Sequence, residues 1–234
     1  MKKLLCVGCS WTYGFGVSAD KTYAAHLQNL LDVETINAGC PGTDIEYTIW
    51  STYRLVKEYE FDTVLFQLTT LDRLTFSESG KENFLNKKYH DGSVQEIYIE
   101  DGNYKRVIGI GENKLQRITV STYLESLNKK DEKSFSIKYF NENVIFSNLK
   151  QEKISMQLQL LKSFLNEKNI NVIFFTWLPW HKEFSKTLDP VNIRKDSVIE
   201  FLGEDYFIDN GYHINEHGHR RVAEEYIIPM MTQK

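Results

Sequence analysis

Short apolar runs alternate with segments of helical periodicity over both ends of the chain. The runs cover residues 2–8, 33–37, 63–68 and 171–177, with a shorter fifth one at 206–208. Runs that are apolar on nearly every position are typical of strands covered on both faces. The intervening segments carry helical spacing, and they lie at 23–31, 44–58, 152–166 and 216–230. The alternation predicts a mainly parallel sheet with helices on both faces.

A polar segment at about 74–150 interrupts this alternation. It is rich in lysine and asparagine and has no continuous period. We interpret it as an insertion within a single domain spanning 1–234, with two short strands near 94–99 and 104–108 and a helix near 115–127. Such an insertion after a sheet strand can form a lid or an oligomer contact, or a surface excursion with no role in the site.

Composition narrows the class of protein. The chain has 234 residues, of which 41% are hydrophobic and 26% charged, as in an ordinary soluble globular domain. A net charge of −4 disfavours non-specific binding to nucleic acid or to an anionic membrane. No apolar run approaches the roughly 20 residues that span a bilayer, and no export signal is recognised at the start. Three cysteines without framework spacing indicate a reducing compartment, so we expect a cytoplasmic protein.

A serine directly after the first predicted strand is the strongest chemical signal. Residues 8–14 read Gly-Cys-Ser-Trp-Thr-Tyr-Gly, which delivers Ser10 to the carboxyl edge of the sheet, where open α/β folds bind ligands. Far along the chain, Asp209 and His213 supply an acid and a base that could activate a hydroxyl nucleophile. The structural alternative is that Ser10 and Thr12 only cap a turn.

Three blocks in this order resemble those of the SGNH, or GDSL, hydrolases. Residues 8–14 are similar to the family's Gly-Asp-Ser-x-Thr-x-Gly block, and residues 37–42, Asn-Ala-Gly-Cys-Pro-Gly, to its Asn-x-Gly-x-x-Gly block. Residues 211–219, Gly-Tyr-His-Ile-Asn-Glu-His-Gly-His, resemble the last block, which carries the catalytic histidine. The resemblance covers residues 1–73 and 151–230. It implies a three-layer α/β/α sandwich of the flavodoxin-like type with a mainly parallel five-stranded sheet.

The resemblance also implies an activity and a set of roles. Ser10 would be the nucleophile of a serine esterase and His213 its general base, with Asp209 as the acid. The N–H groups of Ser10 and Gly42 would form the oxyanion hole, with the hydroxyl of Thr69 or Thr70 as a third donor. No cofactor or metal is expected, and the expected partner is a small or polar ester such as an O-acetylated carbohydrate.

Three positions depart from the family pattern. Cys9 replaces the aspartate of the first block, and Leu71, which cannot donate a hydrogen bond from its side chain, stands where the oxyanion asparagine belongs. The acid normally precedes the histidine by three residues, which is Asn210 here. We favour Asp209, one residue earlier, over Asn210 because only a carboxylate stabilises an imidazolium by charge. Asp205 is the third candidate.

Other constellations were weighed against this hypothesis. Cys6 and Cys9 have redox-pair spacing, and His213, His217 and His219 could be a metal cluster, but neither has its usual structural context. The possible substrate contacts at this edge of the sheet are Trp11, Arg73, Trp177 and Trp180. The tryptophan side chains could stack on a substrate or could only wall off the core. The alternative functions are an acyltransferase that uses the same serine and histidine, and a catalytically weakened binding module.

Overall fold

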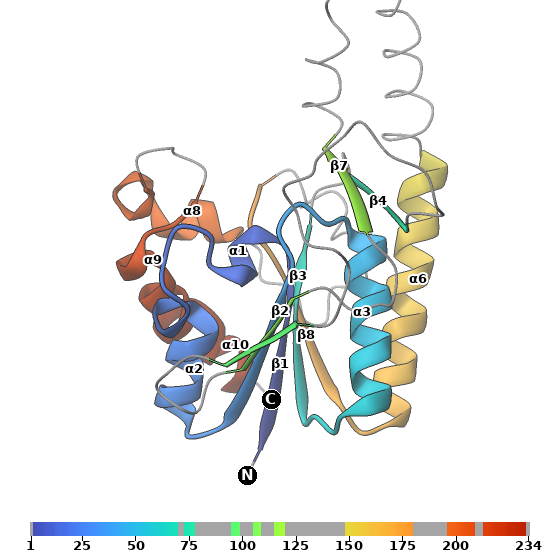
Figure 1. Ribbon diagram of the computed structural model, residues 1–234, viewed down its shortest axis with the longest axis horizontal. Coiled ribbons are helices and arrows are strands. Elements are labelled where there is room, and N and C mark those ends of the chain that lie inside the picture. The colour runs from blue at the N-terminus through green and yellow to red at the C-terminus, as the bar shows by residue number, and fades with distance from the viewer. Residues whose placement is uncertain are drawn as a thin grey trace, which may run out of the picture.

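The computed structural model describes residues 2–69, 148–179, 196–208 and 213–232, together with the backbone of four short strands between residues 73 and 119. Figure 1 shows a central sheet with helices on both sides. The three-layer α/β/α arrangement predicted from the apolar pattern is therefore confirmed.

Six strands form the main sheet, and their bounds are Lys3–Gly8 (β1), Glu34–Gly39 (β2), Thr63–Leu68 (β3), Gln95–Tyr98 (β5), Lys105–Ile108 (β6) and Asn171–Thr176 (β8). Their order is β5-β6-β2-β1-β3-β8. β2, β1, β3 and β8 form a parallel centre, and β6 also runs parallel to β2. β5 pairs antiparallel with β6 at the edge. A separate antiparallel pair joins β4 (Arg73–Ser77) to β7 (Leu115–Thr119).

The helical segments are α1 (Ser10–Tyr13), η1 (Ala19–Lys21), α2 (Tyr23–Leu31), α3 (Ile45–Glu58), α6 (Asn148–Glu167), α8 (Val198–Leu202), η4 (Glu204–Tyr206), α9 (Glu216–Arg221), η5 (Val222–Ile227) and α10 (Ile228–Thr232). α3 and α6 cover one face of the sheet, whereas α2, α9 and α10 lie on the other (Figure 1). Two apolar clusters fill the spaces between the layers, one on each face. Polar caps fix two of the helix starts: the Thr22 side chain accepts from Ala25 N–H, and the Asp44 carboxylate accepts from Tyr47 N–H.

Four of the five predicted strands are confirmed, and the fifth is wrong. Residues 206–208 do not join the sheet, because Tyr206 ends the 3₁₀ turn η4 and Phe207 makes only an isolated bridge with Ile214. The predicted strands near 94–99 and 104–108 are confirmed as β5 and β6, which extend the main sheet beyond β2.

The helix predicted near 115–127 is wrong at its start. Leu115 and Ile118 have helix-like spacing, but residues 115–119 form strand β7 and pair with β4. Here pairing with another segment overrides the local period. The remainder of that predicted helix lies outside the described residues. Within the described part of the chain, no helix has both the length and the apolar character needed to cross a membrane.

Candidate active site

The candidate nucleophile lies where the central strand passes into a single helical turn. β1 ends at Gly8, and α1 begins at Ser10, whose side chain is only 7% exposed. The turn closes at Gly14, which has a φ of 80° and donates its N–H to Ser10 O and Trp11 O. Glycine adopts this left-handed conformation without a steric penalty. The chain thus turns sharply at the carboxyl edge of the sheet and presents Ser10 there.

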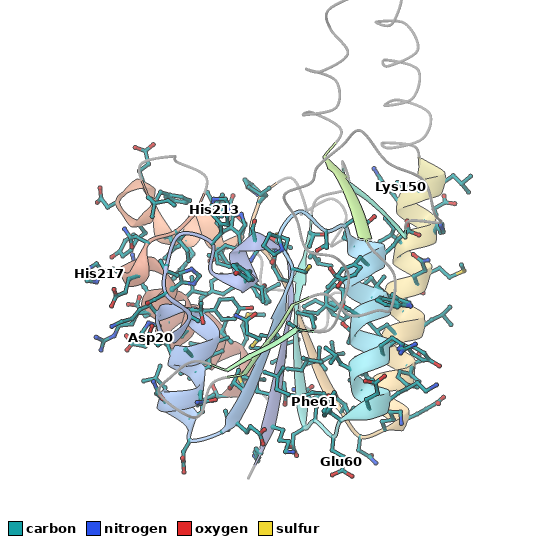
Figure 2. All side chains as sticks on the ribbon, in the orientation of Figure 1. Asp20, Glu60, Phe61, Lys150, His213 and His217 are labelled. Atoms are coloured by element: carbon teal, nitrogen blue, oxygen red, sulfur yellow. The ribbon has the colours of Figure 1, made fainter. Side chains whose placement is uncertain are left out.

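The candidate base comes from the other end of the chain. His213 Nε2 lies 3.1 Å from Ser10 Oγ, although the two residues are 203 positions apart in the sequence. A short two-stranded contact holds the histidine: Ile208 N–H donates to His213 O at 2.8 Å, and Asn215 N–H donates to Tyr206 O at 2.8 Å. Figure 2 shows His213 at the edge of the molecule where α1 lies. The prediction that these side chains meet is borne out by this geometry.

Aromatic rings surround the histidine. The Phe15 ring centroid lies 4.9 Å from the His213 ring, and the Trp11 centroid lies 5.9 Å from it. Trp177 packs against Trp11 with 4.4 Å between centroids and is only 1% exposed, so it helps to close the core beneath the site. Phe15 is 43% exposed, so part of this ring beside His213 faces solvent. The pattern of the sequence did not single out Phe15.

The second sequence block is bound directly to the first. Asn37 Nδ2 donates to Thr12 O at 2.7 Å, while Asn37 Oδ1 accepts from Gly39 N–H at 2.9 Å. Cys40 N–H donates to Gly8 O at 2.9 Å. The turn that follows contains Gly42 with a φ of 78°. These bonds bring the turn that carries Gly42 alongside the residues that precede Ser10.

Gly39 allows this close approach, which yields a testable prediction. A Cβ at Gly39 would overlap the backbone of Thr12 and Tyr13 in α1. We expect Gly39→Ala to lower the free energy of unfolding by about 3 kcal/mol, the upper end of what overpacking costs, because backbone atoms cannot rotate away. Urea denaturation of the variant and the wild type measures this difference, and an unchanged midpoint would contradict it.

Of the two threonines predicted as a third oxyanion donor, Thr69 is the one that the structure describes. It follows β3, its side chain is fully buried, and within the described part of the chain its hydroxyl has no hydrogen-bond partner. Several positions discussed above as oxyanion donors, substrate contacts or the catalytic acid lie outside the described residues: Thr70, Leu71, Trp180, Asp209 and Asn210. The side chain of Arg73 also lies outside them, although its backbone begins β4. Their roles therefore stay predictions.

The redox and metal alternatives gain no support. Cys6, Cys9 and Cys40 are all buried free thiols, and burial raises the pKa of the Cys6 thiol far above its ordinary value, which keeps it unreactive. Among the described residues, no group of three or more potential ligands is placed to hold a metal ion. His219 points inward instead, where its Nδ1 accepts from Tyr23 N–H at 3.2 Å.

Gln67 is a residue of this region that sequence reasoning missed. Its side chain lies beneath the Ser10 turn and contacts Cys9 and Thr12. The available signal was one long polar side chain inside an apolar strand, since Thr63–Leu68 is otherwise buried and apolar beyond its first residue. A buried amide requires partners, so its presence pointed to a polar network.

Comparisons with known proteins support the same fold. No protein-family model matches the chain, and no curated protein matches it. Among solved structures, TesA superposes with a TM-score of 0.54 at 12% identity, covering 99% of this chain and 98% of that chain. A protein described as lipolytic and of the G-D-S-L family, from Desulfitobacterium hafniense, gives 0.51 at 8% identity, with 96% and 97% covered.

A third neighbour is a catalytic mutant of Axe2, an acetylxylan esterase from Geobacillus stearothermophilus. It gives a TM-score of 0.53 at 11% identity, with 98% of this chain and 94% of that chain covered. At such low identities the superpositions show the fold alone, but they extend over nearly the whole chain. This chain therefore has the fold of the SGNH, or GDSL, hydrolases, as its three sequence blocks predict.

Proposed function

We propose that this chain is a serine esterase with Ser10 as nucleophile and His213 as general base. The observation that carries the proposal is the 3.1 Å separation between Ser10 Oγ and His213 Nε2. A serine hydroxyl is a weak nucleophile until an adjacent base accepts its proton, and this distance is within hydrogen-bond reach.

The strands β5 and β6, which extend the same sheet, support a single domain that includes the polar segment.

The proposed reaction proceeds in two steps. His213 Nε2 takes the Ser10 proton while Ser10 Oγ attacks the ester carbonyl carbon, and the imidazolium then protonates the departing alkoxide. A water molecule, deprotonated by His213, attacks the acyl-enzyme. This attack forms a tetrahedral intermediate. When the intermediate collapses, it expels Ser10 Oγ, which regains a proton from His213, and releases the carboxylic acid. Ester plus water thus becomes alcohol plus acid, and no cofactor is consumed.

Backbone and hydroxyl donors are proposed to stabilise the oxyanion. Ser10 is the first residue of α1, so its N–H has no partner within the helix. The N–H of Gly42 is the second proposed donor, on the turn that is bonded to Gly8 through Cys40. The buried Thr69 hydroxyl is the third, because it lies at the carboxyl end of β3 beside β1. Thr70 is its alternative. A threonine hydroxyl would then donate the hydrogen bond to the oxyanion that the asparagine, replaced here by Leu71, donates in the family.

The acid is proposed to be Asp209, and the prediction is a comparison of two substitutions. Asp209→Asn removes the charge that stabilises the imidazolium while keeping the shape, so kcat should fall about 10²-fold or more. Asn210→Ala, the matched control at the adjacent position, should change kcat less than about threefold, because Asn210 is not proposed to bind substrate or to stabilise charge. Steady-state hydrolysis of one ester measures both variants, and the reverse ranking would contradict the assignment.

A small or polar acyl ester, such as an O-acetylated carbohydrate, is the proposed substrate. The exposed Phe15 ring beside His213 offers a flat apolar surface of the kind on which a sugar ring stacks. Trp11 packs against both the His213 ring and the buried Trp177, so a second aromatic ring borders the histidine. The esterase Axe2, which shares the fold, is described as acting on acetylxylan, and this adds to the support.

The proposal is tested with a fluorophosphonate probe and a series of p-nitrophenyl esters of increasing chain length. We expect stoichiometric labelling that maps to Ser10, and kcat/KM highest for acetate. An acetylated xylooligosaccharide should also release acetate. Folded protein that takes up no probe and turns over no ester would overturn the esterase proposal, whereas a preference for long chains would overturn only the substrate class.

A further inference from the structure

The side chain of Gln67 is buried directly beneath the nucleophile turn. It is only 1% exposed, on the central strand β3 next to β1. Its Oε1 accepts two hydrogen bonds, from Cys9 N–H at 2.9 Å and from the Thr12 hydroxyl at 2.9 Å. Because a backbone N–H can only donate, the oxygen must face Cys9, and the orientation of the amide is determined.

The other half of the amide is also bonded. Gln67 Nε2 donates to Cys9 Sγ at 3.2 Å and to Leu68 O at 3.4 Å. Both of these groups are acceptors, so the whole amide is satisfied in one orientation. Gly8 makes the approach possible, since a Cβ there would overlap Gln67 Oε1 and the Thr12 hydroxyl. The four hydrogen bonds, and the room left by the missing Cβ of Gly8, hold the Gln67 side chain in one position.

These contacts fall on both sides of Ser10. Cys9 precedes the serine and Thr12 follows it, so one oxygen atom binds the start and the end of the turn. The turn needs such support, because α1 has only four residues and its N-cap, Cys9, makes no side-chain capping bond. The Thr12 hydroxyl also accepts from Tyr23 OH at 3.1 Å, which ties the same point to α2.

We propose that Gln67 is a positioning residue that fixes the Ser10 turn so that Ser10 N–H points at the developing oxyanion. Gln67 acts through Cys9 and Thr12, by its bonds to the Cys9 N–H, the Cys9 thiol and the Thr12 hydroxyl, and none of its described hydrogen bonds goes to Ser10 Oγ or His213. Its partner Cys9 occupies the position at which the family that this chain resembles carries an aspartate. This inference rests on the proposed esterase function and adds a residue that its sequence blocks do not contain.

The first test is Gln67→Met, which keeps the length of the side chain and removes its hydrogen bonds. A misdirected oxyanion donor lowers the rate of the chemical step and leaves ground-state binding unchanged. We expect kcat for p-nitrophenyl acetate to fall about 30-fold with KM within about twofold of the wild type, and the rate of fluorophosphonate labelling to fall in parallel. Gln67→Glu retains an oxygen for Cys9 N–H and Thr12, so its kcat should recover to within about tenfold of wild type.

The matched control is Gln28→Met. Gln28 is also a glutamine whose Oε1 accepts a backbone N–H from another element, that of Thr35 at 3.1 Å, but this bond joins α2 to the start of β2 and not to the Ser10 turn. Its replacement should lower stability and leave kcat unchanged in the folded protein. Equal effects of the two substitutions on kcat would overturn the proposal, because Gln67 would then act only through general stability.

Two further measurements keep the inference testable if Gln67→Met does not fold. Thr12→Val removes one of the two bonds to Oε1 at nearly constant shape, and we expect a fall in kcat of about fivefold; wild-type kcat in this variant would overturn the proposal. Hydrogen exchange of the Cys9 amide reports the bond without any substrate, and it should be slow both in the wild type and in Gln67→Glu, which keeps an oxygen for this amide. If the wild type hydrolyses no ester, the esterase proposal fails, whereas rapid Cys9 exchange in the wild type overturns the Gln67 contact itself.

Discussion

Ser10→Ala is expected to lower kcat for p-nitrophenyl acetate about 10⁴-fold or more and to abolish fluorophosphonate labelling. The substitution removes the hydroxyl oxygen that lies 3.1 Å from His213 Nε2. Without it no acyl-enzyme forms, and only direct attack by water remains, aided by the oxyanion donors. The described hydrogen bonds of the Ser10 hydroxyl are those with His213 and, at a long 4.0 Å, with Cys9 Sγ. Neither joins strands of the sheet, so the loss of the hydroxyl should leave the fold intact.

Ser18→Ala is the matched control for that experiment. Ser18 is an exposed serine in the same loop region, at the start of η1, and its side chain makes no capping hydrogen bond. This variant should label and turn over like the wild type. Residual turnover in Ser10→Ala above about 1% of the wild-type rate, with contamination excluded by labelling, would contradict the assignment of the nucleophile.

His213→Gln is expected to lower kcat by about 10³-fold or more, with a similar loss in the rate of labelling. Glutamine is comparable in size to histidine and can still bond to Ser10, but it has no group that accepts a proton near neutral pH. The loss should be smaller at high pH, because hydroxide then replaces part of the missing base. Activity profiles from pH 6 to about 10 for the variant and the wild type measure this effect.

His217→Gln serves as the control for the histidine. His217 is exposed on α9, four residues beyond His213, and Figure 2 shows it pointing away from the body of the protein. Wild-type activity is expected in this variant. Equal losses in both variants would favour the metal alternative, and full activity in His213→Gln would remove the general base from the mechanism.

The sequence predicted those parts of the fold that depend on local patterns. The buried parallel strands appear as unbroken apolar runs, because both of their faces are covered, and Thr63–Leu68 is the plainest case. The Ser10 turn and the His213 segment were found through the family blocks, whose residue types are dictated by the chemistry. The meeting of Ser10 with His213 followed because both segments belong at the carboxyl edge of one sheet.

What could not be predicted depends on contacts between distant segments. Residues 206–208 have the composition of a strand, but Phe207 finds its partner at Ile214, seven positions along, and the main sheet ends elsewhere. Likewise, the spacing of Leu115 and Ile118 indicates a helix until β4 is available for pairing. Gln67 was missed because its partners, Cys9 and Thr12, are more than fifty positions away.

The order in which the parts of this site are joined along the chain has a consequence for its synthesis. All four strands of the parallel centre, and the turn that carries the serine, have been synthesised once residues 171–176 have emerged. The imidazole arrives only with the short bridge between Phe207 and Ile214, close to the last helices. A polypeptide released before that segment is made would lack the general base of the proposed mechanism. Under the proposed mechanism, the protein can hydrolyse an ester only after the C-terminal segment that carries His213 has joined the fold.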